Sequence, residues 1–155
     1  ELTVELAREM LTAAGKPDAD IEAALKDGRA MDRWREMITA QGGDPDAPLP
    51  VAKDTHDVVA ERDGYLTRLD ALSVGVASWR LGAGRARAGE EVQAVAGIEL
   101  HAKPGDKVVK GQPLMTLHTA TPQRFERALQ TLEGGYDIGD EKPAERASVV
   151  LDRIS

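Results

Sequence analysis

The sequence of 155 residues contains no cysteine, which excludes disulfide bonds, thiolate nucleophiles and thiolate metal sites. Aromatic residues make up only 3% of it, so a core must be built from aliphatic side chains and methionine. The longest apolar run extends roughly from Leu72 to Trp79, whereas a membrane-spanning helix takes about 20 residues. Positive charge is scarce too: the formal net charge is −7, which argues against a nucleic-acid surface. We therefore expect a cytoplasmic globular protein with neither a membrane nor a nucleic-acid partner.

The first fifty residues have the pattern of three short helices. The first is predicted over 2–14, the second from a cap at Asp18 or Asp20 to Leu25, and the third up to Gly42. A proline-rich linker follows over 44–50. Because the chain starts at Glu1 and enters a helix at once, we expect a fragment of a longer protein. The expected apolar faces consist of Leu2, Leu6, Met10 and Leu11 in the first helix and of Met31, Trp34, Met37 and Ile38 in the third.

After Pro50, short strands dominate the pattern. Strands are predicted over 58–60, 65–67, 95–102, 107–109 and 114–119, the first two hinged at Asp63-Gly64. A closing strand is predicted around Val149, Leu151 and Ile154. The result is an α+β fold, a helical lead-in before a mostly non-local sheet. Two helices accompany the strands: one over 71–81, with Leu72, Val74, Val76 and Trp79 facing inward and Gly82 past its end, and one containing Phe125, Leu129 and Leu132.

The most distinctive segment is 103–117, which has the rhythm Gly-Asp-x-Val-x-x-Gly-Gln-x-Leu. Pro104-Gly105-Asp106 and Gly111-Gln112-Pro113 are turn sequences, because proline presets φ and glycine supplies positive φ. They predict a hairpin. The same rhythm is typical of two different kinds of domain: the arms that carry biotin or lipoate, and the C-terminal domain of nucleoside phosphorylases.

Candidate chemical groups are present, but none forms a convincing site. His56, His101 and His118 lie far apart in the sequence, and no spacing among them or with flanking carboxylates indicates a metal. Gly82-Ala-Gly-Arg85 follows a helix, whereas a phosphate loop precedes one, so a helix cap is the better interpretation. Arg80, Arg85 and Arg87 are interpreted as a solvated basic rim that balances Glu90 and Glu91.

The carboxylate pairs lie in turns and linkers, without an apolar pocket that would raise a pKa for general acid catalysis. The serines lack a nucleophile elbow. The sequence therefore predicts no catalytic, substrate-binding, phosphate-binding or metal-binding residue and no cofactor in this chain. The pairs are Asp18 with Asp20, Asp44 with Asp46, Glu90 with Glu91 and Asp140 with Glu141, and the serines are Ser73, Ser78, Ser148 and Ser155.

The carrier interpretation requires a lysine at a hairpin tip downstream of the first glycine turn. After Leu117 the chain has no lysine until Lys142, and Lys107 and Lys110 precede the second strand. Cofactor attachment is therefore not expected, and a non-catalytic barrel-sandwich module of the biotinyl or lipoyl type, for binding or as a carrier, remains the alternative.

A larger resemblance involves an ordered series of glycine motifs. Gly64-Tyr-Leu-Thr-Arg-Leu-Asp70, Leu81-Gly-Ala-Gly-Arg85, Val95-Ala-Gly-Ile98 and the 105–114 segment closely resemble the C-terminal domain of thymidine phosphorylase and the pyrimidine nucleoside phosphorylases. The upstream helices and the final Val149–Ser155 segment are similar to that family as well. The resemblance covers essentially the whole chain.

The resemblance implies an α/β-hammerhead-like domain of mostly antiparallel strands with two helices over 49–155. It implies that 1–48 is the tail end of the family's large α/β domain. Family members are homodimers that use inorganic phosphate to cleave a pyrimidine nucleoside, giving thymine and 2-deoxyribose 1-phosphate from thymidine. Their phosphate and base motifs lie in the N-terminal two-thirds and have no counterpart here, so this chain is expected to be structural and inactive alone. A related phosphorylase of nucleoside monophosphates shares the architecture, and the choice between thymidine and uridine stays open.

Overall fold

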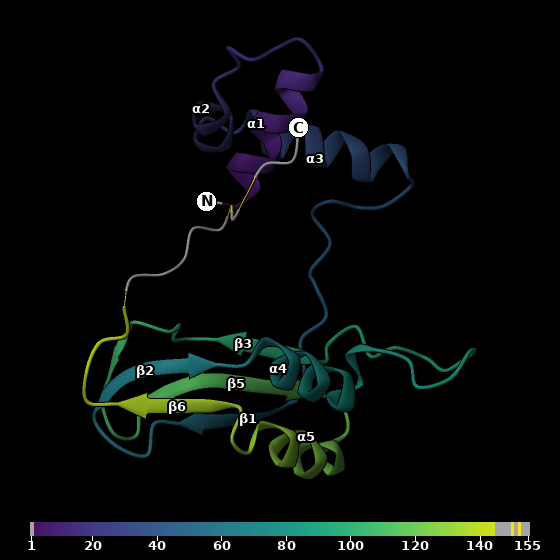
Figure 1. Ribbon diagram of the computed structural model, residues 1–155. Helices are drawn as coiled ribbons and strands as arrows, with labels where there is room; N and C mark the ends of the chain where they lie inside the picture. The colour runs from purple at the N-terminus through teal and green to yellow at the C-terminus, as the bar shows by residue number, and fades with distance from the viewer. Residues whose placement is uncertain (1, 145–149, 151, 153–155) are drawn as a thin grey trace. The chain divides into compact units, whose positions relative to one another are not determined.

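The computed structural model describes residues 2–144, 150 and 152 (Figure 1). This part of the chain contains five α-helices and two three-stranded antiparallel sheets, which confirms the predicted α+β class. The residues divide into two compact units, a helical unit up to Leu49 and a sheet unit from Pro50. The closing strand predicted around Val149, Leu151 and Ile154 lies outside the described residues.

The helical unit has the three predicted helices: α1 (Leu2–Ala13), α2 (Ile21–Lys26) and α3 (Arg29–Ala40). Asp20 caps α2, since its carboxylate accepts a hydrogen bond of 2.9 Å from the Ala23 N–H. A 3.0 Å ion pair between Arg8 and Glu22 connects α1 with α2. Ile21 is the only hydrophobic residue that the structure describes as buried in this unit, so its core is small.

The sheet unit consists of two sheets whose strands are interleaved in sequence. One sheet has the order β1 (Asp54–Val59), β5 (Pro113–Thr119), β3 (Gly97–Leu100). The other has the order β4 (Lys107–Val108), β2 (Gly64–Leu69), β6 (Tyr136–Gly139). The strand β6 was not predicted from the sequence.

The predicted hairpin at 103–117 is wrong. The glycines do turn the chain, with φ of 98° at Gly105 and 83° at Gly111. However, β4 pairs with β2, while β5 pairs with β1 and β3. The segment therefore crosses from one sheet to the other. Likewise β1 and β2, on either side of Asp63-Gly64, belong to different sheets.

Two apolar clusters fill the sheet unit, and β5 contributes to both. Met115 and Leu117 face α4 (Ala71–Ser78) and α5 (Phe125–Leu132), together with Ala77, Leu81 and Leu132. Leu114 belongs instead to the second cluster. The remaining buried members are Val58 and Ala128 in the first cluster and Ala60, Leu66, Ala102 and Val108 in the second.

The inward face predicted for the helix over 71–81 is partly wrong. Leu72 and Trp79 are 74% and 41% exposed, whereas Ala77 and Leu81 are fully buried. Val74 does pack against the first core cluster. Because α4 is apolar on almost every side, hydrophobic periodicity alone does not identify the face that packs against α5.

A buried polar network joins the end of β5 to the loop that follows α4. The helix ends in a π-helical turn, Trp79–Ala83 (η1), and the buried Thr119 hydroxyl donates to the Leu81 carbonyl at 2.8 Å. The Gln93 amide oxygen accepts from the Ala120 N–H at 2.9 Å, and its amide nitrogen donates to the Thr121 hydroxyl at 3.0 Å. The backbone N–H of Gln93 also donates to the Gly82 carbonyl at 2.9 Å. These bonds fix both ends of the 84–92 loop.

Replacing Thr119 with valine tests this network. The substitution keeps the shape of the side chain but leaves the Leu81 carbonyl and the Thr121 N–H without their partner. We expect Thr119→Val to lower the free energy of unfolding by about 1–3 kcal/mol in urea titrations. Thr55→Val, on an exposed position of β1, is the control and should change it much less. Equal effects of the two substitutions would contradict the assigned role.

Two glycines of the sheet unit provide a second test of stability, one as the test position and one as its control. At Gly64, φ is +154°, and an added Cβ would lie 2.5 Å from the backbone oxygen of Gly139 on β6. At Gly97 an added Cβ meets nothing within 4 Å. Gly64→Ala should therefore cost about 1–3 kcal/mol of unfolding free energy, because backbone on β6 must move. Gly97→Ala should be tolerated, and thermal melts that rank the two in reverse would refute this assignment.

Candidate functional site

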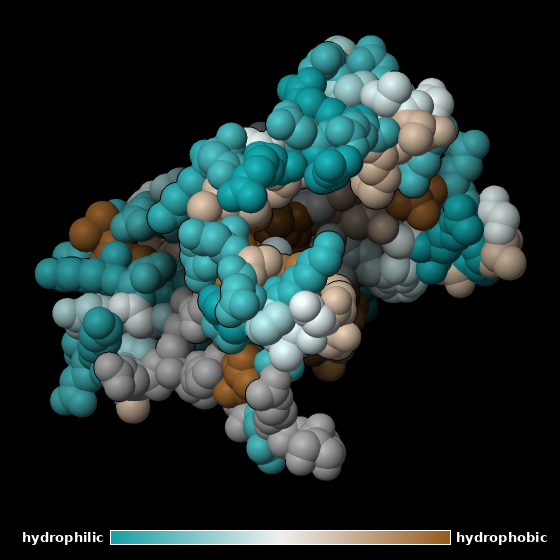
Figure 2. Space-filling view, turned by 90° about the horizontal axis from the view of Figure 1, so that it is seen from above, coloured by the Kyte–Doolittle hydropathy of each residue, from teal (hydrophilic) through white to brown (hydrophobic). Residues whose placement is uncertain are grey.

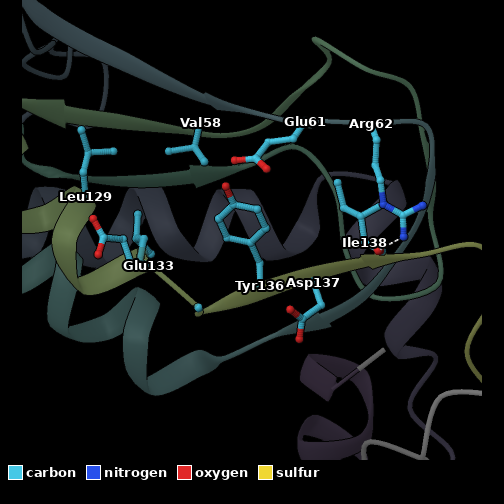
Figure 3. Close-up of a pocket in the computed structure, with 10 residues that line it drawn as sticks. Val58, Glu61, Arg62, Leu129, Glu133, Tyr136, Asp137 and Ile138 are labelled. Carbon is cyan, nitrogen blue, oxygen red and sulfur yellow. Dashed lines mark hydrogen bonds between the residues drawn. The ribbon is translucent and has the colours of Figure 1, made fainter.

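The hollow in Figure 3 lies between β1, α5 and β6. It has a volume of about 570 Å³. Val58, Leu129, Leu132 and Ile138 provide apolar walls. The polar groups on the lining are Glu61, Arg62, Glu133, Tyr136 and Asp137.

Tyr136 is the central polar group of this hollow. Its ring rises from β6, and its hydroxyl points toward the carboxylate of Glu61 (Figure 3). Burial, and secondarily the negative charge of Glu61, raise the pKa of the Tyr136 hydroxyl above its usual value of 10.0. The group therefore stays protonated at neutral pH and can donate a hydrogen bond, but it cannot act as a base there.

The arginines around the hollow bind residues of β6 and its two ends. Arg62 donates to the Ile138 carbonyl and pairs with Asp140. Arg68 pairs with Asp137 at 2.6 Å and donates to the Gly134 carbonyl. Glu61 and Glu133 then leave the lining negative, which suits a phosphate dianion poorly. The sequence analysis missed this hollow because its residues come from segments about 70 positions apart.

A second hollow, of about 880 Å³, lies between the end of α4 and α5 and is richer in positive charge. Arg80 donates from Nη1 to the Arg127 carbonyl at 3.0 Å, so part of its guanidinium is used in holding α5. Trp79 donates from Nε1 to the Arg85 carbonyl at 3.0 Å. The other lining residues are Gly84, Ala86, Glu90, Gln123, Arg124, Glu126 and Gln130.

In the described structure, the predicted basic rim is not connected to its acidic neighbours by ion pairs. Within the described part of the chain, no ion pair joins Arg80, Arg85 or Arg87 to Glu90 or Glu91. The Glu90 carboxylate instead accepts from the Ala86 N–H at 2.9 Å. It therefore closes the loop on itself.

Gly82-Ala-Gly-Arg85 lies at the C-terminal end of a helix, as predicted. Gly82 is buried, with φ of 118°, and its carbonyl accepts from Gln93. An added Cβ on Gly82 would lie 2.9 Å from the Gln93 side chain. Carbonyls rather than N–H groups are presented here, so the segment has no anion cradle.

The three histidines are closer in space than the sequence suggested, since β1, β5 and the residue after β3 belong to one sheet. They nevertheless have different partners. His56 lies against Phe125, with ring centroids 5.7 Å apart, and His118 Nε2 is 3.8 Å from Glu99. His101 Nε2 is 2.7 Å from the Thr116 hydroxyl. Among residues 2–144, 150 and 152, no three His, Asp or Glu side chains could hold a metal ion.

Thr116 links His101 to a third strand, an arrangement that the sequence did not reveal. Its hydroxyl donates to Asp57 at 2.6 Å. Because that proton is used, the neutral His101 must carry its own proton on Nε2 to donate to Thr116. The chain of bonds crosses the open face of the sheet, where no described cavity offers a place for a substrate. It can orient side chains, but it has no reacting group to activate.

Tyr136→Phe tests the environment of the hollow through alkaline unfolding. A raised pKa in the folded state means that the unfolded chain ionises first, so stability present below pH 10 is lost as the pH rises above it. We expect melting temperatures to fall more steeply between pH 9 and about 11 in the wild type than in Tyr136→Phe. Tyr65→Phe is the control. Parallel curves for wild type and Tyr136→Phe would contradict a partly buried hydroxyl beside Glu61.

Comparison with known proteins places this geometry in a family. Residues 65–139 match the pyrimidine nucleoside phosphorylase C-terminal domain. Thymidine phosphorylase of Mycobacterium tuberculosis (strain H37Rv) is 48% identical over 154 residues, which are 99% of this chain and 36% of that protein. Pyrimidine-nucleoside phosphorylase of Bacillus subtilis (strain 168) is 39% identical over 76% of this chain and 30% of its own length. The protein of the same name from Staphylococcus aureus (strain NCTC 8325) is 34% identical over 90% of this chain and 35% of its own length.

The chain thus spans about a third of the length of these relatives. The matched residues, 65–139, include strands of both sheets and both helices of the sheet unit. The chain belongs to the thymidine and pyrimidine nucleoside phosphorylase family, and it corresponds to the C-terminal portion of the family's proteins.

Proposed function

We propose that this chain is the structural C-terminal part of an enzyme that reversibly phosphorolyses thymidine or a similar pyrimidine nucleoside. In that reaction, phosphate attacks C1′ of the sugar and the base departs, which gives thymine and 2-deoxy-α-D-ribose 1-phosphate from thymidine. The observation that carries the proposal is the 48% identity to a thymidine phosphorylase over 99% of this chain. Because the chain corresponds to only 36% of that protein, the reaction is assigned to the whole enzyme.

The chemistry of the described residues supports a structural rather than a catalytic role for this chain. Phosphorolysis requires positive groups that hold a phosphate dianion against the sugar. The hollow around Tyr136 is lined by three carboxylates, and its one arginine, Arg62, is bonded to β6 and Asp140. In the basic hollow, Arg80 and Arg124 direct guanidinium N–H groups at backbone carbonyls. These contacts support the proposal that neither hollow binds the phosphate.

The carboxyl groups with clearly displaced pKa values support the same conclusion. A hydrogen bond from Arg29 lowers the pKa of Asp27, and the Ser73 N–H lowers that of Asp70 at the start of α4. A general acid needs the opposite displacement. Both aspartates stabilise turns or helix ends in their charged form.

The proposed division of the protein follows the two units. Residues 1–48 would be the tail end of the large α/β domain, and 49–155 a hammerhead-like domain that completes it and supports one wall of the cleft. The remaining N-terminal domains would supply every phosphate- and base-binding residue. We propose a cytoplasmic homodimer that acts in nucleoside salvage. Whether the base is thymine or uracil, and whether the substrate carries a 5′-phosphate, depends on those domains.

A carrier or binding module is the second candidate, because segment 103–117 has two turns typical of barrel-sandwich domains. The interleaved sheets are the observation in its favour. Intact-mass measurement tests the carrier form of this second candidate. A lysine-attached cofactor would add mass to the chain, whereas a phosphorylase part should have the mass of the bare sequence.

The activity prediction compares the purified 155-residue chain with the whole protein. Incubated with thymidine, uridine and inorganic phosphate, the whole protein should release free base, detected by chromatography. The chain alone should release no more than a buffer control, since we propose that the phosphate site lies in the remaining domains of the enzyme. Base release by the chain alone would overturn the structural assignment, and an inactive whole protein would overturn the enzymatic one.

A further inference from the structure

The helix α1 is apolar on two sides. Val4, Ala7 and Leu11 are partly buried, and they occupy one side of the helix. The stripe of Leu2, Leu6 and Met10 lies on another side and is 51%, 54% and 66% exposed. A helix that is hydrophobic on most of its circumference is normally enclosed by neighbours. Among the described residues of the helical unit, α1 contacts α2, to which the Arg8–Glu22 ion pair connects it.

The helix α3 has the same property. Met31, Trp34 and Met37 recur at spacings of three residues, so they share one face, and they are 53%, 43% and 48% exposed. The opposite face carries Asp32 and Glu36, which suit water. No residue of α1 or α3 is buried in the described structure.

Exposed apolar area of this kind marks an interface. Isolated helices of about 12 residues are marginal in water, and most of their stability in proteins comes from packing an apolar face. Here each helix has such a face and nothing described covers it. Figure 2 shows apolar residues on a largely hydrophilic surface, in several separate places. Single exposed residues need no explanation, but two helical stripes of three large side chains each do.

We propose that these two stripes, Leu2-Leu6-Met10 on α1 and Met31-Trp34-Met37 on α3, are the surface on which the preceding part of the enzyme packs. This inference rests on the proposed function. The occupant follows from length: the matched domain is C-terminal, and the chain covers 36% of a thymidine phosphorylase. In that thymidine phosphorylase about two-thirds of the length lies outside the matched part, and because the matched domain is C-terminal, we take the preceding part of the proposed enzyme as the occupant.

The methionines permit a test on the unmodified full-length protein. The chain has four: Met10, Met31 and Met37 on the stripes, and Met115, which is 1% exposed in the sheet core. Peroxide converts methionine to its sulfoxide at a rate that depends on exposure, and peptide mass mapping gives each rate. We expect Met10, Met31 and Met37 of the native full-length protein to react at least about tenfold slower than in urea, as Met115 does.

Two cysteine variants test whether protection from a reagent depends on the face of α3. Met31→Cys and Glu36→Cys introduce thiols on opposite faces of α3 into a segment that has no cysteine. In the native full-length protein, maleimide should label the first about tenfold more slowly than the second. The rates should become equal in urea.

The proposal fails if Met10, Met31 and Met37 oxidise within about threefold of their rates in urea while Met115 stays protected. Protection that disappears on dilution would assign the stripes to a second copy and overturn the proposal. The isolated 155-residue chain is measured as well. If Met10, Met31 and Met37 are protected in it, with Met115 protected too, then the sheet unit of the same chain covers the stripes and the proposal is overturned. Phosphorolysis measured on the same full-length sample separates these outcomes from failure of the proposed function.

Discussion

The position of β5 in the middle of its sheet is the constraint on which the sheet unit depends. It pairs with β1 on one side and β3 on the other, so its register determines theirs. Met115 and Leu117 point into the cluster beneath α4 and α5, while Leu114 belongs to the second cluster. A slip by one residue would exchange these side chains for Thr116 and His118 and would disrupt the clusters. At its end, Thr119 hydrogen-bonds to Leu81, so the same register positions the loop after α4.

Local signals in the sequence predicted most of the elements, because each element here is short and its ends are chemically marked. Asp20 caps α2 and Asp70 caps α4, and the glycines after the helices have positive φ. Pairing between strands was not predictable in the same way. The turns at Gly105 and Gly111 resemble a hairpin locally, yet β4 and β5 join different sheets. The partner of a strand depends on contacts distant in sequence, and turn residues carry no information about it.

The errors in burial have a common physical cause. Leu72 and Trp79 were expected inside, but α4 meets α5 and the sheet through the smaller Ala77 and through Leu81. Close helix packing favours small side chains at the contact, and an apolar helix gives periodicity no contrast to exploit. The strand β6 was missed since Tyr-Asp-Ile-Gly is too short to alternate. Consequently the hollow around Tyr136, which β6 completes, was missed as well.

In the proposed division of the enzyme, the residues that reveal the family are different from the residues that perform the reaction. Gly64 is required because β6 approaches its backbone, and Gly82 because the Gln93 side chain lies against it. Such positions restrict the residue type through geometry, which requires no part in a reaction. A phosphate-binding active site requires charged groups that converge in a hollow. Arg62, Arg68 and Arg80 are instead directed at backbone carbonyls of their own domain. We therefore propose a structural role for this domain, and for the uncovered stripes of α1 and α3 in the other unit a role in packing against the preceding part of the enzyme.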